Sequence, residues 1–262
     1  MPVHTGRAAL HLLSQLALRD FRQRYSGSIL GWLWGVVHPL VLLAVYTFVF
    51  RHALGARLPA GEATDVYPLF LMAGLLPWLL FSETVSRAAT SVTEFSALIK
   101  RSVFPSEVVP AAIFLSTACV HLLWLAVLVV AVAGLGHAPR PEFALLPLSF
   151  VPLGLFGMGL GWLAAALQVY LRDTSQVLSV LLIAWFWATP VFLPESMYRG
   201  AFRLLLDWNP LRSAVLGYRS ALLGGAGPDA GQFALLWLSG LLAAAVGWRF
   251  FRRAKRGFVD VL

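Results

Sequence analysis

The chain has 262 residues, of which 59% are hydrophobic and only 12% are charged. This small number of charged side chains cannot cover the surface of a water-soluble globule. The composition therefore indicates a membrane protein. The single cysteine, Cys119, excludes an internal disulfide framework and a cysteine-based metal site. The net charge of +8 is compatible with nucleic acid, anionic lipid or topological signals, and the placement of the charges decides between them.

The first 28 residues precede the first long apolar run and carry a helical pattern. Leu13, Ala17 and Phe21 recur at four-residue steps, which predicts an amphipathic helix that lies along the cytoplasmic membrane surface. A plain cytosolic extension is the alternative. We expect no cleavable signal peptide, because charged residues stand where its apolar stretch would end. The candidate residues of this interfacial helix are Arg19, Asp20, Arg22, Arg24 and Tyr25.

Uncharged stretches of the chain are near or above the length that a transmembrane helix needs, about 20 residues for roughly 30 Å of hydrocarbon. They cover residues 26–50, 66–82, 108–139, 143–171, 174–194 and 230–248. We therefore predict an all-α membrane protein with six spans. With the first residue in the cytoplasm, the inner segments carry 13 Arg and Lys and the outer segments 7, which places both termini in the cytoplasm. The basic C-terminal end is then a topology anchor rather than a nucleic-acid site.

A short amphipathic stretch lies in the second predicted cytoplasmic segment, before Pro105. It either packs on the ends of its own spans or inserts into a groove on a cytoplasmic partner, and the pattern leaves both interpretations open. Its candidate residues are Glu94, Phe95, Leu98, Ile99, Lys100 and Arg101.

The segment 194–229, between the fifth and sixth predicted spans, is too long and too apolar for a simple loop. Asn209 followed by Pro210 is typical of an N-cap and the first position of a helix. We predict two short re-entrant helices on the outer face, where irregular backbone needs a protein cover. Arg212 and Arg219 are seven residues apart, so they either hold an anionic group or extend to the outer headgroups.

Motifs of enzymatic chemistry are missing from the sequence. It contains no G-x-x-x-x-G-K-[ST] loop, and its six histidines lack the paired spacing of a helical metal site. We therefore predict no catalytic residue, no metal and no cofactor in this chain. Glu83 and His121 are the titratable groups well inside apolar runs, and each is either functional or a helix-packing residue.

Aromatic residues are concentrated in the first and fifth predicted spans and in the outer segment. Trp at span ends usually belongs to the interfacial belt, but proteins also use aromatic faces against sugar rings and polyprenyl chains. The candidate substrate-path residues are Trp34, Trp185, Phe186, Trp187, Tyr198 and Tyr218.

Five stretches together resemble a known family. They read RDFRQRYSGSILGWLWGVVHPLVLLAVYTFVF, PLFLMAGLLPWLLFSETV, SALIKRSVFPSEVVP, YLRDTSQVL and WNPLRSAVLGYR. From about residue 17 to its end, the chain is similar to the membrane subunit of ABC exporters for bacterial cell-surface polysaccharides such as O-antigen, capsule and teichoic acid. His38-Pro39 stands where Asn-Pro is usual in that family.

The resemblance implies a homodimer of six-span subunits that pairs with a separate nucleotide-binding ABC ATPase, which binds ATP and Mg. The complex would export a lipid-linked polysaccharide across the inner membrane, with no nucleic acid partner. The short helix near Phe95 would be the coupling helix, and the helices after Pro194 would form an outer gate. The N-terminal helix would also touch the ATPase, and aromatic residues of spans one and five would line the sugar path.

We expect residues 1–262 to form a single transmembrane domain. Its parts would be an interfacial helix 1–28, spans one to five 29–193, outer gate helices 194–229, span six 230–250 and a cytoplasmic tail 251–262. Two other functions stay open. One is ABC export of a drug, a lipid or haem. The other is a membrane acyl- or glycosyltransferase, although its candidate acids Glu83, Asp173 and Asp207 belong to different membrane faces.

Overall fold

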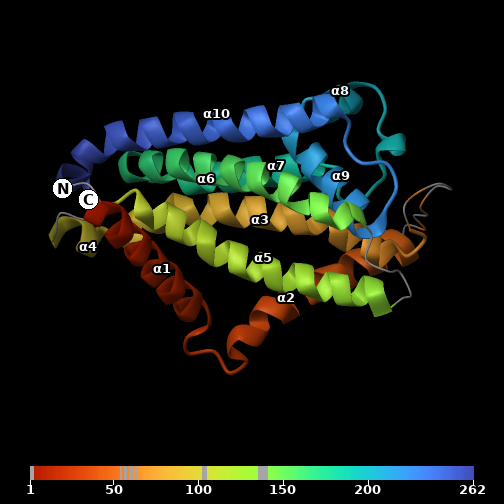
Figure 1. The fold of residues 1–262 in the computed structure, drawn as a ribbon, viewed down its shortest axis with the longest axis horizontal. Coiled ribbons are helices and arrows are strands. Elements are labelled where there is room, and N and C mark those ends of the chain that lie inside the picture. Colours follow the sequence, from red (N-terminus) through yellow and green to blue (C-terminus); the bar gives the residue numbers. More distant parts are fainter. Residues whose placement is uncertain are drawn as a thin grey trace.

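A computed structural model describes residues 3–53, 55, 58, 62, 64–101, 105–134 and 141–262 of the chain. The regular elements in these residues are helices, as the composition and periodicity predict. The long ones run side by side along the longest axis of the molecule, with α3 in the middle (Figure 1). They are α3 (Tyr67–Glu94), α5 (Val108–Gly134), α6 (Leu146–Tyr170), α7 (Thr174–Trp187) and α10 (Ala230–Ala254).

The short helices lie at the two ends of this bundle. The chain termini and α4 (Ser96–Arg101) are at one end, whereas α8 (Ala201–Asp207) and α9 (Pro210–Leu223) are at the other (Figure 1). The predicted coupling segment and the predicted outer helices are therefore separated by the full length of the bundle.

Five helical segments in the described part of the chain are long and apolar enough to cross a membrane. They are Trp34–Ala53, Tyr67–Glu94, Val108–Gly134, Pro141–Tyr170 and Ala230–Gly257. The chain is therefore a multi-pass membrane protein. The predicted span 174–194 differs, because its helix α7 has only 14 residues, about 21 Å at 1.5 Å per residue.

Pro190 explains why α7 stops early. Proline has no backbone N–H and disfavours helical conformation at the residue before it, here Thr189. The chain continues after Trp187 without helical structure, yet residues 189–192 are all buried. We call residues 188–194 the buried strap.

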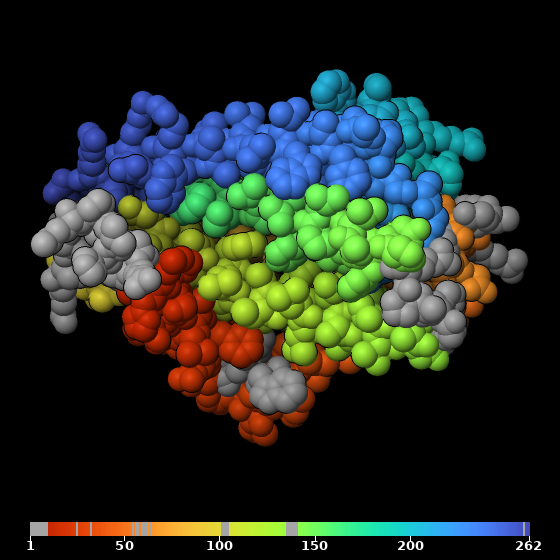
Figure 2. All heavy atoms as spheres, viewed as in Figure 1, coloured from red at the N-terminus to blue at the C-terminus, as the bar shows by residue number. Residues whose placement is uncertain are grey.

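Before the bundle, α1 (Val3–Tyr25) lies against its side. Leu16 and Ala17 are buried against Ala112 of α5, and Figure 2 shows α1 (red) beside α5 (yellow-green). The amphipathic pattern of the N-terminal segment is thus satisfied, at least in part, by the chain's own helices.

A proline inside α2 (Trp34–Thr47) is accommodated by a side chain from another helix. Pro39 cannot donate a hydrogen bond to the carbonyl of Gly35, four residues earlier. The indole Nε1 of Trp124, on α5, donates to that carbonyl instead, at 2.6 Å. The helix then passes into a π-helical segment, Phe48–Ala53.

Helices α6 and α10 touch through their backbones. A Cβ atom at Gly247 would collide with the carbonyl of Gly159, and one at Gly159 would collide with the backbone of Ala243. Small residues that permit such close approach are common where membrane helices cross. These glycines fix how closely the last span packs on the bundle.

The C-terminal end folds back onto the bundle instead of leaving it. The helix α11 (Phe258–Val261) brings the ring of Phe258 to 5.4 Å from that of Phe251, and both rings are buried. The ammonium group of Lys255 pairs with the carboxylate of Glu107 at 2.7 Å. The expected tail 251–262 is therefore packed.

Candidate functional site

An open hollow of about 330 Å³ lies between α2, α3 and α7. Aromatic rings and serine hydroxyls line it together with aliphatic side chains. Its aromatic and hydroxyl-bearing residues are Tyr46, Trp78, Phe186, Ser82, Ser86 and Ser179. Aromatic faces beside hydroxyl groups suit a ligand with both apolar faces and polar edges, as a sugar ring has.

The aromatic rings of this hollow continue into a cluster that reaches the buried strap. The ring of Phe186 lies 5.0 Å from those of both Trp78 and Phe192. Tyr46 and Trp187 approach the Phe192 ring to 4.9 and 5.2 Å. We call these five rings the aromatic cluster. Trp187 is 57% exposed, so part of the cluster is accessible to a ligand.

The other predicted substrate-path residues lie elsewhere. Trp185 points to the opposite side of α7, where it packs on two core phenylalanines, and Trp34 is exposed at the start of α2. Tyr218 is fully buried, with its hydroxyl 2.8 Å from Nε2 of His121. Tyr198 is half-buried, and its hydroxyl lies 3.5 Å from a carbonyl of the buried strap. Of the six candidates, only Phe186 and Trp187 share the cluster.

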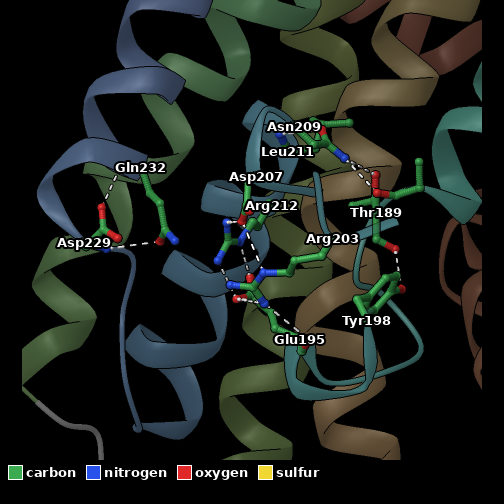
Figure 3. Close-up of polar contacts among 11 residues, drawn as sticks. Thr189, Glu195, Tyr198, Arg203, Asp207, Asn209, Leu211, Arg212, Asp229 and Gln232 are labelled. Carbon is green, nitrogen blue, oxygen red and sulfur yellow. Dashed lines mark hydrogen bonds and ion pairs between the residues drawn. The ribbon is translucent and has the colours of Figure 1, made fainter. Parts of the chain in front are cut away.

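Asn209 fixes the start of the buried strap. Its Nδ2 donates to the carbonyl of Ala188 at 3.0 Å and to Oγ1 of Thr189 at 3.1 Å. Its Oδ1 accepts from Nε1 of Trp185 at 3.0 Å and from the backbone N–H of Leu211 at 3.1 Å. Figure 3 shows Asn209 turned toward Thr189 while it caps α9. The predicted N-cap is thus confirmed, and the same side chain joins two elements.

Arg219 and Tyr67 hold the rest of the strap. The guanidinium group of Arg219 is buried, and its Nη2 donates to the carbonyl of Val191 at 2.8 Å. Its Nε donates to the carbonyl of Phe70 at 3.3 Å, and its Cζ lies 3.5 Å from the centre of the Phe70 ring. The hydroxyl of Tyr67 donates to the carbonyl of Phe192 at 3.0 Å. Three carbonyls of the buried, non-helical strap are thus paired with side-chain donors.

Ion pairs connect the short helices at the end of the bundle that carries α8 and α9. Arg212 donates to both carboxylate oxygens of Glu195, at 2.5 and 2.7 Å, and to Asp207 at 2.5 Å. Arg203 lies 3.3 Å from Asp207 and 3.7 Å from Glu195 (Figure 3). The hydrogen bonds to Glu195 are the main cause that raises the pKa of Arg212 above its ordinary value. Arg212 is thus committed to holding α8 and α9 together.

Of the apolar side chains in and just before α4, some pack on the bundle and others are exposed. Ile99 is buried and Phe95 is half-buried, and both pack on the chain's own helices. Glu94, Leu98 and Lys100 are exposed at this end of the bundle. The outward residues form a surface that a cytoplasmic protein could contact.

Two ion pairs connect α1 to α3. Asp20 accepts from Nη2 of Arg87 at 2.7 and 2.8 Å, and Arg24 pairs with Glu83. Asp20 and Arg24 are four residues apart on α1, and Glu83 and Arg87 are four apart on α3. The two ion pairs therefore lie one helical turn from each other. Glu83, whose role the sequence left open, therefore anchors the N-terminal helix.

The remaining predicted residues of α1 and α4 are Arg19, Arg22, Tyr25 and Arg101. The guanidinium of Arg19 lies 5.8 Å from the ring centre of Phe95, and Arg22 is exposed. The side chains of Tyr25 and Arg101 lie outside the part of the chain that the structure describes.

The serines of the hollow were not among the predicted residues, although the sequence contains a signal for them. Trp78, Ser82 and Ser86 follow one another at four-residue steps, which places them on one face of α3. Polar residues that recur with an aromatic on one face of a membrane helix indicate a surface that does not face lipid. Tyr46 gives no comparable signal, because its neighbours on α2 are apolar.

Comparison with known proteins places the chain in a family. Residues 11–223 match the family model described as ABC-2 type transporter. The chain is 31% identical to the O-antigen export system permease protein RfbA of Myxococcus xanthus, over 84% of this chain and 83% of the relative. It is 27% identical to RfbA of Klebsiella pneumoniae, over 96% and 95%. It is 25% identical to the polysialic acid transport protein KpsM of Escherichia coli, over 93% of both chains.

The family match covers most of the chain, including α2 to α9 and the hollow between α2, α3 and α7. It agrees with the resemblance that the sequence motifs indicate. The chain is therefore a member of the ABC-2 type transporter family of membrane proteins.

Proposed function

We propose that this chain is the permease subunit of an ATP-driven exporter that moves a lipid-linked polysaccharide, of the O-antigen or a related cell-surface class, across the bacterial inner membrane. The observation that carries the proposal is the extent of the similarity. Proteins named as O-antigen export permeases align over most of their own length with most of this chain. The polysialic acid transport protein aligns to a similar extent.

The hollow and the aromatic cluster support a glycan substrate. A chain of sugars that crosses about 30 Å of hydrocarbon needs many weak contacts, because tight binding at one point would prevent its release. An aromatic face provides such a contact, of about 0.5–1.5 kcal/mol by analogy with aromatic pairs. Trp187 and Phe186 are the predicted path residues in the cluster, and Trp78 with Ser82 extends the surface toward α3.

The proposed membrane arrangement has six crossings and both termini in the cytoplasm. In this arrangement α7 and the buried strap together make the fifth crossing, since the donors of Asn209, Arg219 and Tyr67 satisfy strap carbonyls. The exposed apolar faces of α2 and α7 are available to lipid and to the second subunit of a homodimer. The 13-to-7 distribution of Arg and Lys supports the same orientation.

Energy comes, in this proposal, from a separate nucleotide-binding ABC ATPase that binds ATP and Mg. Its docking surface is the end of the bundle that carries α4 and both termini (Figure 1). There, Glu94, Leu98 and Lys100 are exposed, whereas Ile99 anchors α4 to the bundle. An anchored helix with exposed residues can transmit a push from a partner to the spans.

The outer helices are proposed as the gate at the exit of the path. The ion pairs of Arg212 hold α8 and α9 together as one body. Asn209 links this body to the buried strap and so to α7. A movement of α7 during transport would therefore also move the outer cover.

The function is tested by deleting the gene and measuring the polysaccharide on the cell surface. We expect surface polysaccharide to be lost and lipid-linked glycan to accumulate in the cell, and the intact gene to restore export. Trp187→Ala should lower export per assembled complex by roughly twofold to tenfold, the factor for one aromatic contact of 0.5–1.5 kcal/mol.

Phe250→Ala is the control, because Phe250 is also an exposed aromatic residue but lies on α10, outside the hollow, the aromatic cluster and the outer helices. A deletion strain with normal surface polysaccharide would contradict the proposed function. Equal export by Trp187→Ala and Phe250→Ala would instead remove the aromatic cluster from the path and leave the proposed function standing.

A further inference from the structure

A second groove lies on the other side of α7, away from the hollow. It runs between α6 and α7, has a volume of about 910 Å³ and is open along one side. It extends from the turn at Arg172, between the two helices, to Trp185 near the end of α7, with Phe81 of α3 among its lining residues. This groove is larger than the hollow of about 330 Å³, and the proposed transport path does not use it.

The walls of the groove are apolar over nearly its whole length. Its polar lining residues gather at the turn, at Arg172, Asp173 and Thr174. Val177 and Leu181 on α7 are each 57% exposed, so the chain's own side chains do not fill the space between the helices. A long apolar groove with charged groups only at one end matches a hydrocarbon chain with a polar head.

The charged lining residues of the groove are one cation, Arg172, and one acid, Asp173. The two do not form an ion pair, and Arg172 has no other acidic partner within ion-pair distance in the described part of the chain. Tyr170, at the same end, donates its hydroxyl to the carbonyl of Ala254 at 2.6 Å, which brings the last turn of α10 to the mouth of the groove.

That last turn of α10 and the 3-10 turn after it, Lys255–Gly257, carry further basic residues. Arg252, Arg253 and Arg256 are exposed, and among the described residues none of them has an ion pair with a carboxylate. Lys255, between them, is committed to Glu107. Basic residues next to a membrane surface attract anionic lipids by about 1 kcal/mol each.

We propose that this groove binds an acidic phospholipid, with one acyl chain between α6 and α7 and the phosphate at Arg172. The apolar walls account for the acyl chain, and the unpaired cations at the mouth account for the preference for an anionic head. The lipid would fill the space beside α7 and steady that helix. This inference rests on the groove and on the basic residues near its mouth, and it does not depend on what the transporter exports.

The test measures bound lipid on the full transporter in nanodiscs that contain equal amounts of phosphatidylglycerol and phosphatidylcholine with identical acyl chains. Native mass spectrometry counts the lipids retained per subunit. We expect phosphatidylglycerol to be retained in preference, and Arg172→Gln to lower its retention about fivefold, the factor for about 1 kcal/mol. Arg199→Gln is the matched control, because Arg199 is exposed at the opposite end of the bundle.

A second pair of variants tests the groove itself without changing its charge. Val177→Trp should fill the groove and displace the lipid, whereas Val180→Trp, on the same exposed helix but outside the groove, should not. Equal lipid retention by Arg172→Gln and Arg199→Gln, or by the two Trp variants, would overturn the proposal. Efficient disulfide linkage of two subunits through Val177→Cys, with Cys119 replaced by Ser, would also overturn it, because a second copy would then occupy the groove.

Discussion

At the residue scale, the roles of Asn209 and Arg219 depend on contacts with residues that are distant in the sequence. The Asn-Pro pair correctly predicts a helix cap, because capping involves only neighbouring residues. The bonds of Asn209 to Ala188 and Thr189 join residues 21 and 20 positions apart, and no local sequence pattern predicts them. Arg219 was predicted to bind an anion or extend to the headgroups, but the fold buries it against backbone carbonyls.

We expect Arg219→Met to destabilise the buried strap. The carbonyl of Val191, in the non-helical strap, would lose its donor while it stays away from water, at a cost of about 1–3 kcal/mol for the unsatisfied group. The fraction of detergent-solubilised protein that survives heating measures the effect. Arg199→Met, at an exposed position, is the control. If both variants resist heat equally, Arg219 does not hold the strap.

At the element scale, the sequence predicts the kinds of helix well and their ends and partners less well. The predicted span 174–194 rests on the run of apolar residues alone. Pro190 lies inside this run, and it ends α7 early and leaves a buried strap. The predicted amphipathic helix at the N-terminus is present, but part of its apolar face packs on α5. Amphipathicity shows that a helix has an apolar side and cannot distinguish a membrane surface from a protein surface.

The ion pairs between α1 and α3 predict a charge-swap result. Arg24→Glu should loosen α1, because it places a second carboxylate against Glu83. The double variant Arg24→Glu with Glu83→Arg should recover most of the loss, with a coupling of about 1 kcal/mol for a partly exposed pair. Protease sensitivity of α1 in membranes measures both. A double variant as sensitive as Arg24→Glu alone would mean that the pair does not hold α1.

For α4, the exposed residue Leu98 provides a test of the proposed contact with the ATPase. Leu98→Asp should reduce co-purification of the ATPase about tenfold, because the new charge would lose its water shell at the interface. Leu204→Asp introduces the same charge at an exposed site on α8, at the opposite end, and should leave co-purification unchanged. Normal co-purification of the ATPase with Leu98→Asp would place the contact elsewhere.

At the scale of the whole molecule, the sequence predicts the class of protein, and the structure supplies the arrangement. Composition and uncharged runs are properties of the chain as a whole, so they identify a membrane protein and its long apolar helices without knowledge of contacts. The hollow and the groove lie on either side of α7 and involve helices distant in sequence. Such features depend on how the helices pack, which periodicity does not determine.

The arrangement of the ends leads to a prediction about topology. Both chain termini and α4 lie at one end of the bundle (Figure 1). If that end faces one side of the membrane, the number of crossings is even, and the proposed sixth crossing is α7 with the buried strap. With the more basic end in the cytoplasm, alkaline phosphatase fused after Leu262 should be inactive, since this enzyme works only outside the inner membrane. The same enzyme inserted after Ala226, between α9 and α10 at the other end, should be active. If both fusions are active, α10 does not cross the membrane. If the fusion after Leu262 is active and the one after Ala226 is inactive, the orientation is inverted, and α4 faces away from any cytoplasmic ATPase.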